Sequence, residues 1–215
     1  MSSVIDNLEK LNRKERFFLI GTALGNPNFR LDAKFRIELG NKFRLDVPEN
    51  AFIAMDYHLN WIFAAAALTF GASVKDRIYD NRGQFIDGTQ EDIDLLVAFT
   101  DKSNITHLIM LEAKGVTAFS NMQFKHKIAR FMKIYGDDGR LWWPNIKPYF
   151  GLISRREPQR LQLDKCPSWL KVDGQIPWFE IPIPRNRLTV FGCDETGAPN
   201  AKRAFWTVKQ EASLP

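Results

Sequence analysis

The 215-residue sequence has few of the residues that mark disulfide-rich or metal-binding proteins. Its two cysteines, Cys166 and Cys193, form no CxxC pair. Two distant cysteines favour buried free thiols in a reducing compartment over a disulfide. The three histidines, His58, His107 and His126, lack the spacing of a metal site. The sequence therefore indicates neither a secreted disulfide scaffold nor a histidine-based metal centre.

Long hydrophobic runs are also missing. The longest, Trp61–Phe70, has ten residues, whereas a bilayer-spanning helix needs about 20. The first eighteen residues carry several charges and no apolar signal-peptide core. We therefore expect a cytoplasmic protein without a membrane partner.

Several catalytic motifs are absent from the sequence. It has no GxxxxGK[ST] phosphate loop, no GxGxxG after a strand, no GxSxG elbow and no HExxH. Nucleotide hydrolysis by a phosphate loop, dinucleotide chemistry, serine-hydrolase chemistry and zincin chemistry are therefore not indicated. The 30 Lys+Arg exceed the 25 Asp+Glu by five, and this positive balance permits an anionic partner.

The first third of the chain has the spacing of helices. Patterns predict one over Asn12–Leu24 and one over Leu31–Phe43, with Asp32 as its N-cap. A third is predicted from Pro48 to Phe70, with Phe52, Met55, Leu59 and Phe63 on its apolar side.

The middle of the chain reads as a sheet with a helix. Near-continuous apolar runs predict strands at Ile93–Phe99 and His107–Leu111, joined by a hairpin turn. Weaker patterns predict a first strand over Ser73–Tyr79 and a fourth over Tyr149–Ile153. Between them a helix from Ser120 or Asn121 carries Phe124, Ile128, Phe131 and Tyr135 toward the core.

The C-terminal part has a different composition. Seven of the eleven prolines follow residue 157, so long regular elements are not expected there. Leu188–Phe191 and Phe205–Val208 flank a turn-rich segment and predict a β-hairpin.

Acidic and basic side chains gather at the ends of the two central strands. Alternation along a strand puts Asp92, Asp94, Leu96 and Ala98 on one face, and Leu108, Met110, Glu112 and Lys114 on one face of the next strand. Because neighbouring strands lie about 4.8 Å apart, Asp94 and Glu112 can share one Mg²⁺ ion. Asp92 is the alternative to Asp94, which lies deeper in its apolar run.

The helix after these strands is basic. It carries Lys125, Lys127, Arg130 and Lys133, and no acid lies between Phe119 and Tyr135. The pattern places Gln123, Lys127 and Arg130 on its non-core side. Lys125, Lys127 and Arg130 are therefore the candidate contacts to a nucleic-acid backbone.

Asp94 followed by Glu112-Ala113-Lys114 at the end of an apolar strand resembles the PD-(D/E)XK nuclease superfamily. The resemblance covers residues 48–155, and Ile93 stands where many members have proline. It implies a restriction-endonuclease-like α/β fold. This is an αβββαβ core with a mixed central sheet flanked by helices, here with N-terminal helices (1–47) and a β-rich extension (156–215) packed on the core.

The same resemblance implies an activity and its residues. Asp94 and Glu112 would hold Mg²⁺ or Mn²⁺, Lys114 would be the catalytic lysine, and Gln123 would assist from the following helix. Glu49 or Asp56 could add a third ligand. The expected function is an endonuclease that hydrolyses DNA rather than RNA, as a restriction or repair enzyme, and a homodimer is one expected form.

Two other functions remain open on the sequence. The same fold could serve as a nucleic-acid-binding module without catalysis. Alternatively, the Trp- and Pro-rich C-terminal part could be the working surface of a protein-interaction domain. For Glu112 and Lys114, the structural alternative is a surface ion pair at a strand end.

Overall fold

The computed structural model describes residues 2–27, 29–71, 78–88, 91–115, 117–138, 140–164, 166–184 and 187–210. The chain forms two compact units, Met1–Glu180 and Ile181–Pro215. Residues 156–180 thus belong to the first unit, and the predicted boundary at residue 155 falls inside it.

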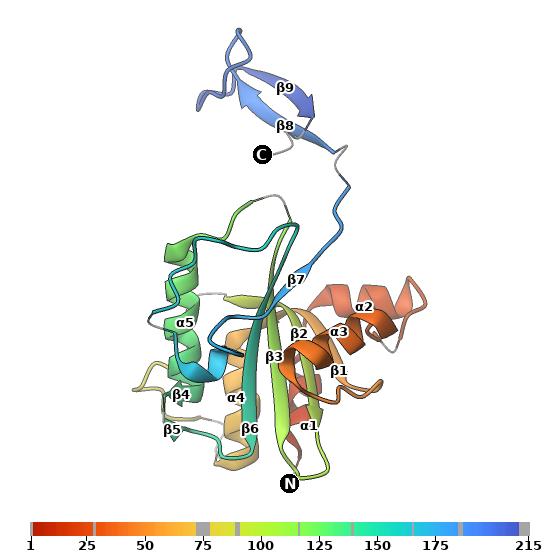
Figure 1. The fold of residues 1–215 in the computed structure, drawn as a ribbon, viewed down its shortest axis with the longest axis vertical. Coiled ribbons are helices and arrows are strands. Elements are labelled where there is room, and N and C mark those ends of the chain that lie inside the picture. Colours follow the sequence, from red (N-terminus) through yellow and green to blue (C-terminus); the bar gives the residue numbers. More distant parts are fainter. Residues whose placement is uncertain are drawn as a thin grey trace. The chain divides into compact units, whose positions relative to one another are not determined.

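The first unit is built on a mixed five-stranded sheet (Figure 1). Its order is β1-β2-β3-β6-β7. Strand β2 runs antiparallel to both neighbours, whereas β3, β6 and β7 are parallel. The strands are β1 (Phe52–His58), β2 (Asp92–Thr100), β3 (Thr106–Lys114), β6 (Ile146–Ser154) and β7 (Trp178–Glu180).

Five α-helices lie within the described part of the chain. They are α1 (Val4–Leu11), α2 (Glu15–Thr22), α3 (Ala33–Phe43), α4 (Leu59–Phe70) and α5 (Asn121–Tyr135). The short elements β4 (Gly136–Asp137), β5 (Arg140–Leu141) and a 3-10 turn at Ser168–Leu170 complete the first unit.

The helices cover both faces of the sheet (Figure 1). On one face, buried side chains of α1, α4 and α5 form a core cluster with Leu96, Met110 and Phe150. On the other, Leu39 and Phe43 of α3 pack with side chains of β2, β3 and β6. Apolar strands covered on both faces explain why β2 and β3 read as continuous hydrophobic runs.

The alternation of side chains is interrupted at one level of the sheet. Residues three apart, Ile93 and Leu96 in β2, pack in the same core cluster, as do Ala54 and Tyr57 in β1. The pairs on either side of Asp56 and Asp94, Met55↔Leu95 and Tyr57↔Ile93, remain in register. Asp56 has φ +50°, a backbone region that non-glycine residues seldom adopt. The in-and-out alternation of side chains is therefore broken in both strands at Asp56 and Asp94, so Ile93 and Leu96 lie on the same face of the sheet.

Several predicted elements are confirmed. Asp32 caps α3 by accepting hydrogen bonds from the amides of Lys34 and Phe35. The two central strands form an antiparallel pair, α5 begins at Asn121, and β6 contains the predicted fourth strand. The mixed α/β class is also confirmed.

The helix predicted from Pro48 is wrong over its first part. Residues Phe52–His58 form edge strand β1, and the helix begins only at Leu59, with the side chain of His58 accepting from the amide of Asn60. The helical spacing of Phe52, Met55, Leu59 and Phe63 arose from two different elements. The helix does end at Gly71, as expected.

The N-terminal prediction needs two corrections. Asn12 ends α1 as its C-cap, and α2 begins at Glu15 without a side-chain cap. The unexpected α1 starts at a capping box in which Ser3 and Asp6 exchange hydrogen bonds. Tyr57 fixes this helix to the sheet, since its buried hydroxyl donates to the carbonyl of Leu8 at 2.8 Å.

Part of one prediction lies outside the described residues. The weak strand expected at 73–79 falls mostly on residues 72–77, which the structure does not describe, and residues 78–80 are irregular. No helix in the described ranges is long and apolar enough to cross a membrane.

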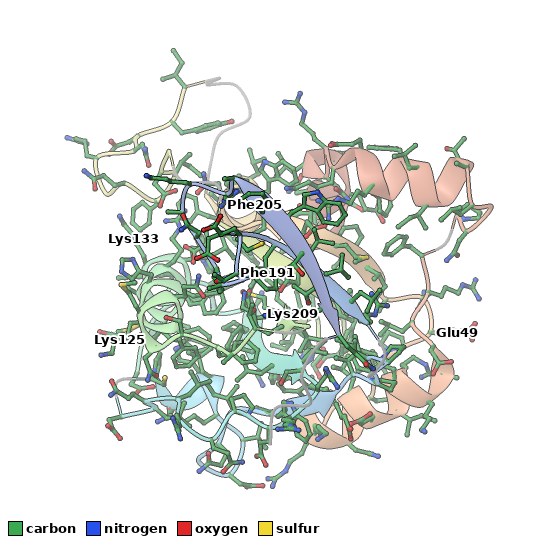
Figure 2. The ribbon with its side chains drawn as sticks, turned by 90° about the horizontal axis from the view of Figure 1, so that it is seen from above. Glu49, Lys125, Lys133, Phe191, Phe205 and Lys209 are labelled. Carbon is green, nitrogen blue, oxygen red and sulfur yellow. The ribbon has the colours of Figure 1, made fainter. Side chains whose placement is uncertain are left out.

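The second unit contains the expected hairpin, formed by β8 (Leu188–Cys193) and β9 (Phe205–Gln210). Lys209 lies over the ring of Phe191, 5.2 Å from its centroid (Figure 2). Both cysteines, Cys166 and Cys193, are buried free thiols, as the sequence predicts.

Candidate active site

Asp94 lies where the pairing between β2 and β3 ends. The last regular pair is Leu95↔Leu111. One residue further on, Oδ2 of Asp94 accepts a hydrogen bond of 2.6 Å from the amide of Ala113. The Asp94 carboxylate thus binds the peptide group that joins Glu112 to Ala113, near the end of β3.

Glu112 is held by two lysines. Lys114 Nζ, two residues along the same strand, lies 3.3 Å from Oε1. Lys127 Nζ, from α5, lies 2.5 Å from Oε2 and also donates to the carbonyl of Asp92 at 2.8 Å. The side chains of Glu112 and Lys127 are only 15% and 11% exposed, so these ion pairs are largely shielded from solvent.

The electrostatics of Asp94 place it in the same group. Burial raises the pKa of its carboxyl above the usual value of 3.8, and the charge of Glu112 raises it further. The amide of Ala113 and the ammonium groups of Lys127 and Lys114 act in the opposite direction. Two carboxylates and two ammonium groups therefore share one charge-balanced site.

The sequence left Asp92 and Asp94 as alternatives. Asp92 lies close to the site but pairs with Lys14, with Lys14 Nζ 2.6 Å from Oδ2. Asp94 instead contacts the Glu112-Ala113-Lys114 segment directly. The contact with the acid-x-lysine triplet thus belongs to Asp94.

A cleft of about 480 Å³ opens beside this group. Its polar side is formed by the strand ends and by the inner edge of α5: Glu91, Asp92, Glu112, Lys114, Gln123 and Lys127. Gln123 lies one helical turn before Lys127, so both reach the same cleft. Gln123 therefore lines the same cleft as Glu112 and Lys114.

The helix α5 contributes to the cleft with its first turn. Ser120, the N-cap of α5, lines the cleft and makes no side-chain capping hydrogen bond. The first backbone amides of a helix favour anions. This end of the cleft is therefore suited to a negatively charged group.

The expected orientation of Lys127 and Arg130 is wrong. Both are buried, at 9% and 5% exposure, because α5 packs against the strand ends on one flank and against residues 85–87 on the other. Lys125 is exposed, and Figure 2 shows Lys125 and Lys133 on the side of α5 that faces away from the sheet. Of the three predicted phosphate contacts, only Lys125 keeps a solvent-facing side chain.

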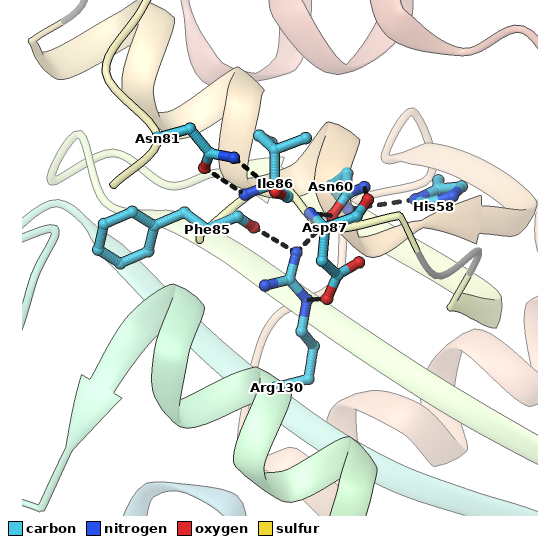
Figure 3. A network of polar contacts seen from close by, with 7 residues as sticks. All are labelled: His58, Asn60, Asn81, Phe85, Ile86, Asp87 and Arg130. Atoms are coloured by element: carbon cyan, nitrogen blue, oxygen red, sulfur yellow. Dashed lines mark hydrogen bonds and ion pairs between the residues drawn. The ribbon is translucent and has the colours of Figure 1, made fainter. Parts of the chain in front are cut away.

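Arg130 has a different task, visible in Figure 3. It donates hydrogen bonds to the side chain of Asn60 and to the carbonyl of Phe85, and its Nε lies 3.5 Å from Oδ2 of Asp87. Asn60 in turn donates to the carbonyl of Asp87 at 2.9 Å. Arg130 thus fastens the segment before β2 to α4 and α5.

The two candidates for a third acid lie elsewhere. Glu49 pairs with Arg30 at 2.6 Å and Asp56 pairs with Arg16 of α2. Neither lines the cleft. Asp94 does not line it either and reaches the site through the amide of Ala113, whereas Asp92 does line it. Sequence reasoning missed Glu91 and His126, which do line it, and the ion pair of Lys127 with Glu112. Burial raises the pKa of Glu91 as well.

Few side chains near the site could hold a divalent cation. In the described ranges, no group of three or more His, Cys, Asp or Glu side chains is arranged to hold a metal ion. Mg²⁺, however, needs only one or two carboxylates and keeps several waters. Asp94 and Glu112 fit that requirement in number and type. Each oxygen of Glu112 already has an ammonium partner, Lys114 at Oε1 and Lys127 at Oε2, which a bound cation would have to share or displace.

Comparisons with known proteins add no further constraint. No protein-family model, no curated protein and no solved structure matches the chain. The candidate site therefore rests on its own residues.

Proposed function

We propose that the protein is a Mg²⁺-dependent nuclease of the PD-(D/E)XK type that hydrolyses phosphodiester bonds in DNA. The observation that carries the proposal is the hydrogen bond between Asp94 and the amide of Ala113. It joins the upstream acid to the Glu112-Ala113-Lys114 segment, although 17 residues separate Asp94 from Glu112 in the sequence.

The order of elements supports the proposal. The resemblance expected its first helix at residues 48–70 and its first strand at 73–79, where the structure has β1 and α4 followed by residues that it does not describe. An αβββαβ order is obtained with α3, β1, β2, β3, α5 and β6, if α3 outside the expected core is its first helix and α4 is an insertion. The first three strands form an antiparallel meander, and α5 connects β3 to the parallel strand β6. The two acids belong to the middle strands and lie at the same end of them, Asp94 near the start of β2 and Glu112 near the end of β3.

Each residue has a chemical role in this proposal. Asp94 and Glu112 would hold Mg²⁺, which polarises the phosphoryl oxygen and lowers the pKa of a bound water. Lys114 would stabilise the negative charge that develops on the phosphate when water attacks phosphorus and the bond to the leaving oxygen breaks. Gln123 of α5 would orient the phosphate or the water.

The remaining assignments follow from this activity and are part of the proposal. The partner is nucleic acid, with Lys125 as its solvent-facing contact on α5, and DNA is preferred over RNA. Free thiols at Cys166 and Cys193 suit a cytoplasmic enzyme. A homodimer is one arrangement in which such an enzyme could act on two strands.

Cleavage assays on three variants test the proposal. Asp94→Asn, Glu112→Gln and Lys114→Met should each abolish cleavage of labelled DNA in Mg²⁺ while circular dichroism remains that of the native protein. Glu49→Gln is the matched control, because Glu49 is an exposed acid outside the cleft, and it should cut normally. Undiminished cleavage by Glu112→Gln and Lys114→Met would refute the proposal.

A second function is favoured by the same ion pairs. Lys114 and Lys127 already neutralise Glu112, as in a structural site that needs no metal. A nucleic-acid-binding module would then bind DNA equally well with and without Mg²⁺. Mg²⁺ would also leave the melting temperature of the wild type unchanged, whereas the nuclease proposal expects a rise that Asp94→Asn lacks.

A further inference from the structure

The cleft beside the candidate site has two chemically different sides. Besides its acids and lysines, the lining has an apolar part that consists of Phe119, Met122, Phe124, Phe150 and Leu152. Phe124, Phe150 and Leu152 belong to the buried core, at 6%, 1% and 2% exposure, and form the floor. Phe119 is half-buried and Met122 is 69% exposed, so these two form the rim.

The exposed Met122 and the half-buried Phe119 add apolar surface to the lining of a charged cleft. Apolar side chains that line a concave site next to a few convergent polar groups are typical of ligand pockets. The volume of about 480 Å³ lies within the usual range for small-molecule sites, roughly 300–1,000 Å³. The ligand must therefore combine a flat apolar part with an anionic part.

The anionic part would lie at the polar side. There Lys114, whose ammonium also pairs with Glu112, and the first turn of α5 at Ser120 line the cleft together with Glu91, Asp92 and Lys127. Phe119 directly precedes Ser120 in the chain, so the rim of the apolar side adjoins the start of the helix. A nucleotide has this combination, because its base is flat and its phosphate is one sugar away.

We infer that the cleft takes an unpaired nucleobase against Phe119 and Met122, next to the phosphate held by the strand ends, so that the substrate is single-stranded or locally unpaired nucleic acid. The inference rests on the proposed nuclease function and narrows its substrate. In an intact duplex the bases are stacked and paired, and a base reaches such a pocket only if it is flipped out at a cost of a few kcal/mol. Stacking on an aromatic ring offsets this cost most easily where the base is already free.

Binding without metal tests the inference separately from catalysis. Fluorescence anisotropy in EDTA at low salt would compare a labelled single strand with the same sequence as a blunt duplex. The wild-type protein should bind the single strand at least about tenfold more tightly. Phe119→Leu keeps the packing but removes the aromatic face, and Met122→Ala alters an exposed side chain that the fold does not need. Phe119→Leu should weaken single-strand binding by about 5- to 100-fold, and Met122→Ala should weaken it less. Both should leave duplex binding unchanged.

The control is Ile37→Ala, which removes an apolar side chain of similar exposure, 57%, from α3 on the other face of the sheet. It should bind like the wild type. Equal affinity for single strand and duplex, or no effect of both Phe119→Leu and Met122→Ala, would overturn the inference. Glu112-dependent cleavage of a fully paired duplex at the same rate as a single strand would also overturn it, while leaving the nuclease proposal standing.

Discussion

Lys127 of α5 places its ammonium nitrogen 2.5 Å from Oε2 of Glu112 in β3. This contact ties the helix to the strand end that carries the acid-x-lysine triplet. Each of these two largely buried charges compensates the other. Removal of one leaves the other without a partner in a poorly solvated position, which is costly.

Glu112→Gln should therefore lower the free energy of unfolding by about 3 kcal/mol, because Lys127 loses its carboxylate partner. The double variant Glu112→Gln, Lys127→Met should recover most of that loss, since the stranded charge is then gone. Denaturant unfolding of the two single variants and the double variant measures the coupling. A double variant that loses the sum of the two single losses would mean that the pair contributes nothing.

The raised pKa of Asp94 predicts a pH dependence of stability. Because burial raises the pKa in the folded chain above 3.8, the ionised carboxylate is less stable folded than unfolded. Its effect is absent below the unfolded pKa and destabilises the fold as pH rises through the higher folded pKa. Asp94→Asn, whose amide oxygen can still accept from Ala113, should raise the melting temperature at neutral pH in metal-free buffer.

At a pH below 3.8 the wild type and Asp94→Asn should melt alike, because Asp94 is then protonated in both states. Addition of Mn²⁺ at neutral pH should reverse the order, because only the wild type gains a bound cation. A lower melting temperature for Asp94→Asn in metal-free neutral buffer would show that the carboxylate stabilises the fold and contradict the account.

Arg130 predicts the behaviour of the segment before β2. Arg130→Met removes the contacts to Asn60, Phe85 and Asp87 and should cost about 3 kcal/mol. Trypsin cleavage after the exposed Arg82 should become faster as the segment loosens. Lys125→Met, an exposed residue of the same helix, is the control and should leave the cleavage rate unchanged. Identical rates for Arg130→Met and the wild type would exclude this fastening role.

The division of the chain predicts the outcome of a truncation. Every member of the two core clusters precedes Ile181, so a chain that ends at residue 184 should keep the cooperative melting and near-ultraviolet circular dichroism of the full protein. Loss of cooperative melting would mean that the hairpin of β8 and β9 is required for the first unit to fold.

Much of the architecture could be predicted where local signals and tertiary packing agree. Asp32 marks the start of α3, and the apolar runs of β2 and β3 bracket a tight turn, so both were found. Helix α1 was missed although its signal, Ser3 three residues before Asp6, is a capping-box pattern. Strand β1 was misread because Phe52 and Met55 continue the helical spacing of the residues that follow them.

The site could be predicted only in part, for a physical reason. The triplet at Glu112 and the upstream Asp94 can be predicted because each lies at one end of an apolar strand, Asp94 near the start of β2 and Glu112 near the end of β3. The partners of Lys127 and Arg130 cannot be predicted from the sequence. The sequence pattern of a helix is the same whether a basic side chain on its flank faces water or pairs with a carboxylate from a distant segment. Lys127 contacts Glu112 because α5 packs beside the end of β3, and this packing depends on the tertiary structure.

The most direct test of the central claim is anomalous diffraction from crystals soaked in Mn²⁺. The account predicts a peak between the carboxylates of Asp94 and Glu112, and its loss in Asp94→Asn crystals with the fold preserved. A well-ordered structure in which Lys127 still contacts Glu112, with no anomalous peak at these carboxylates in saturating Mn²⁺, would contradict the account.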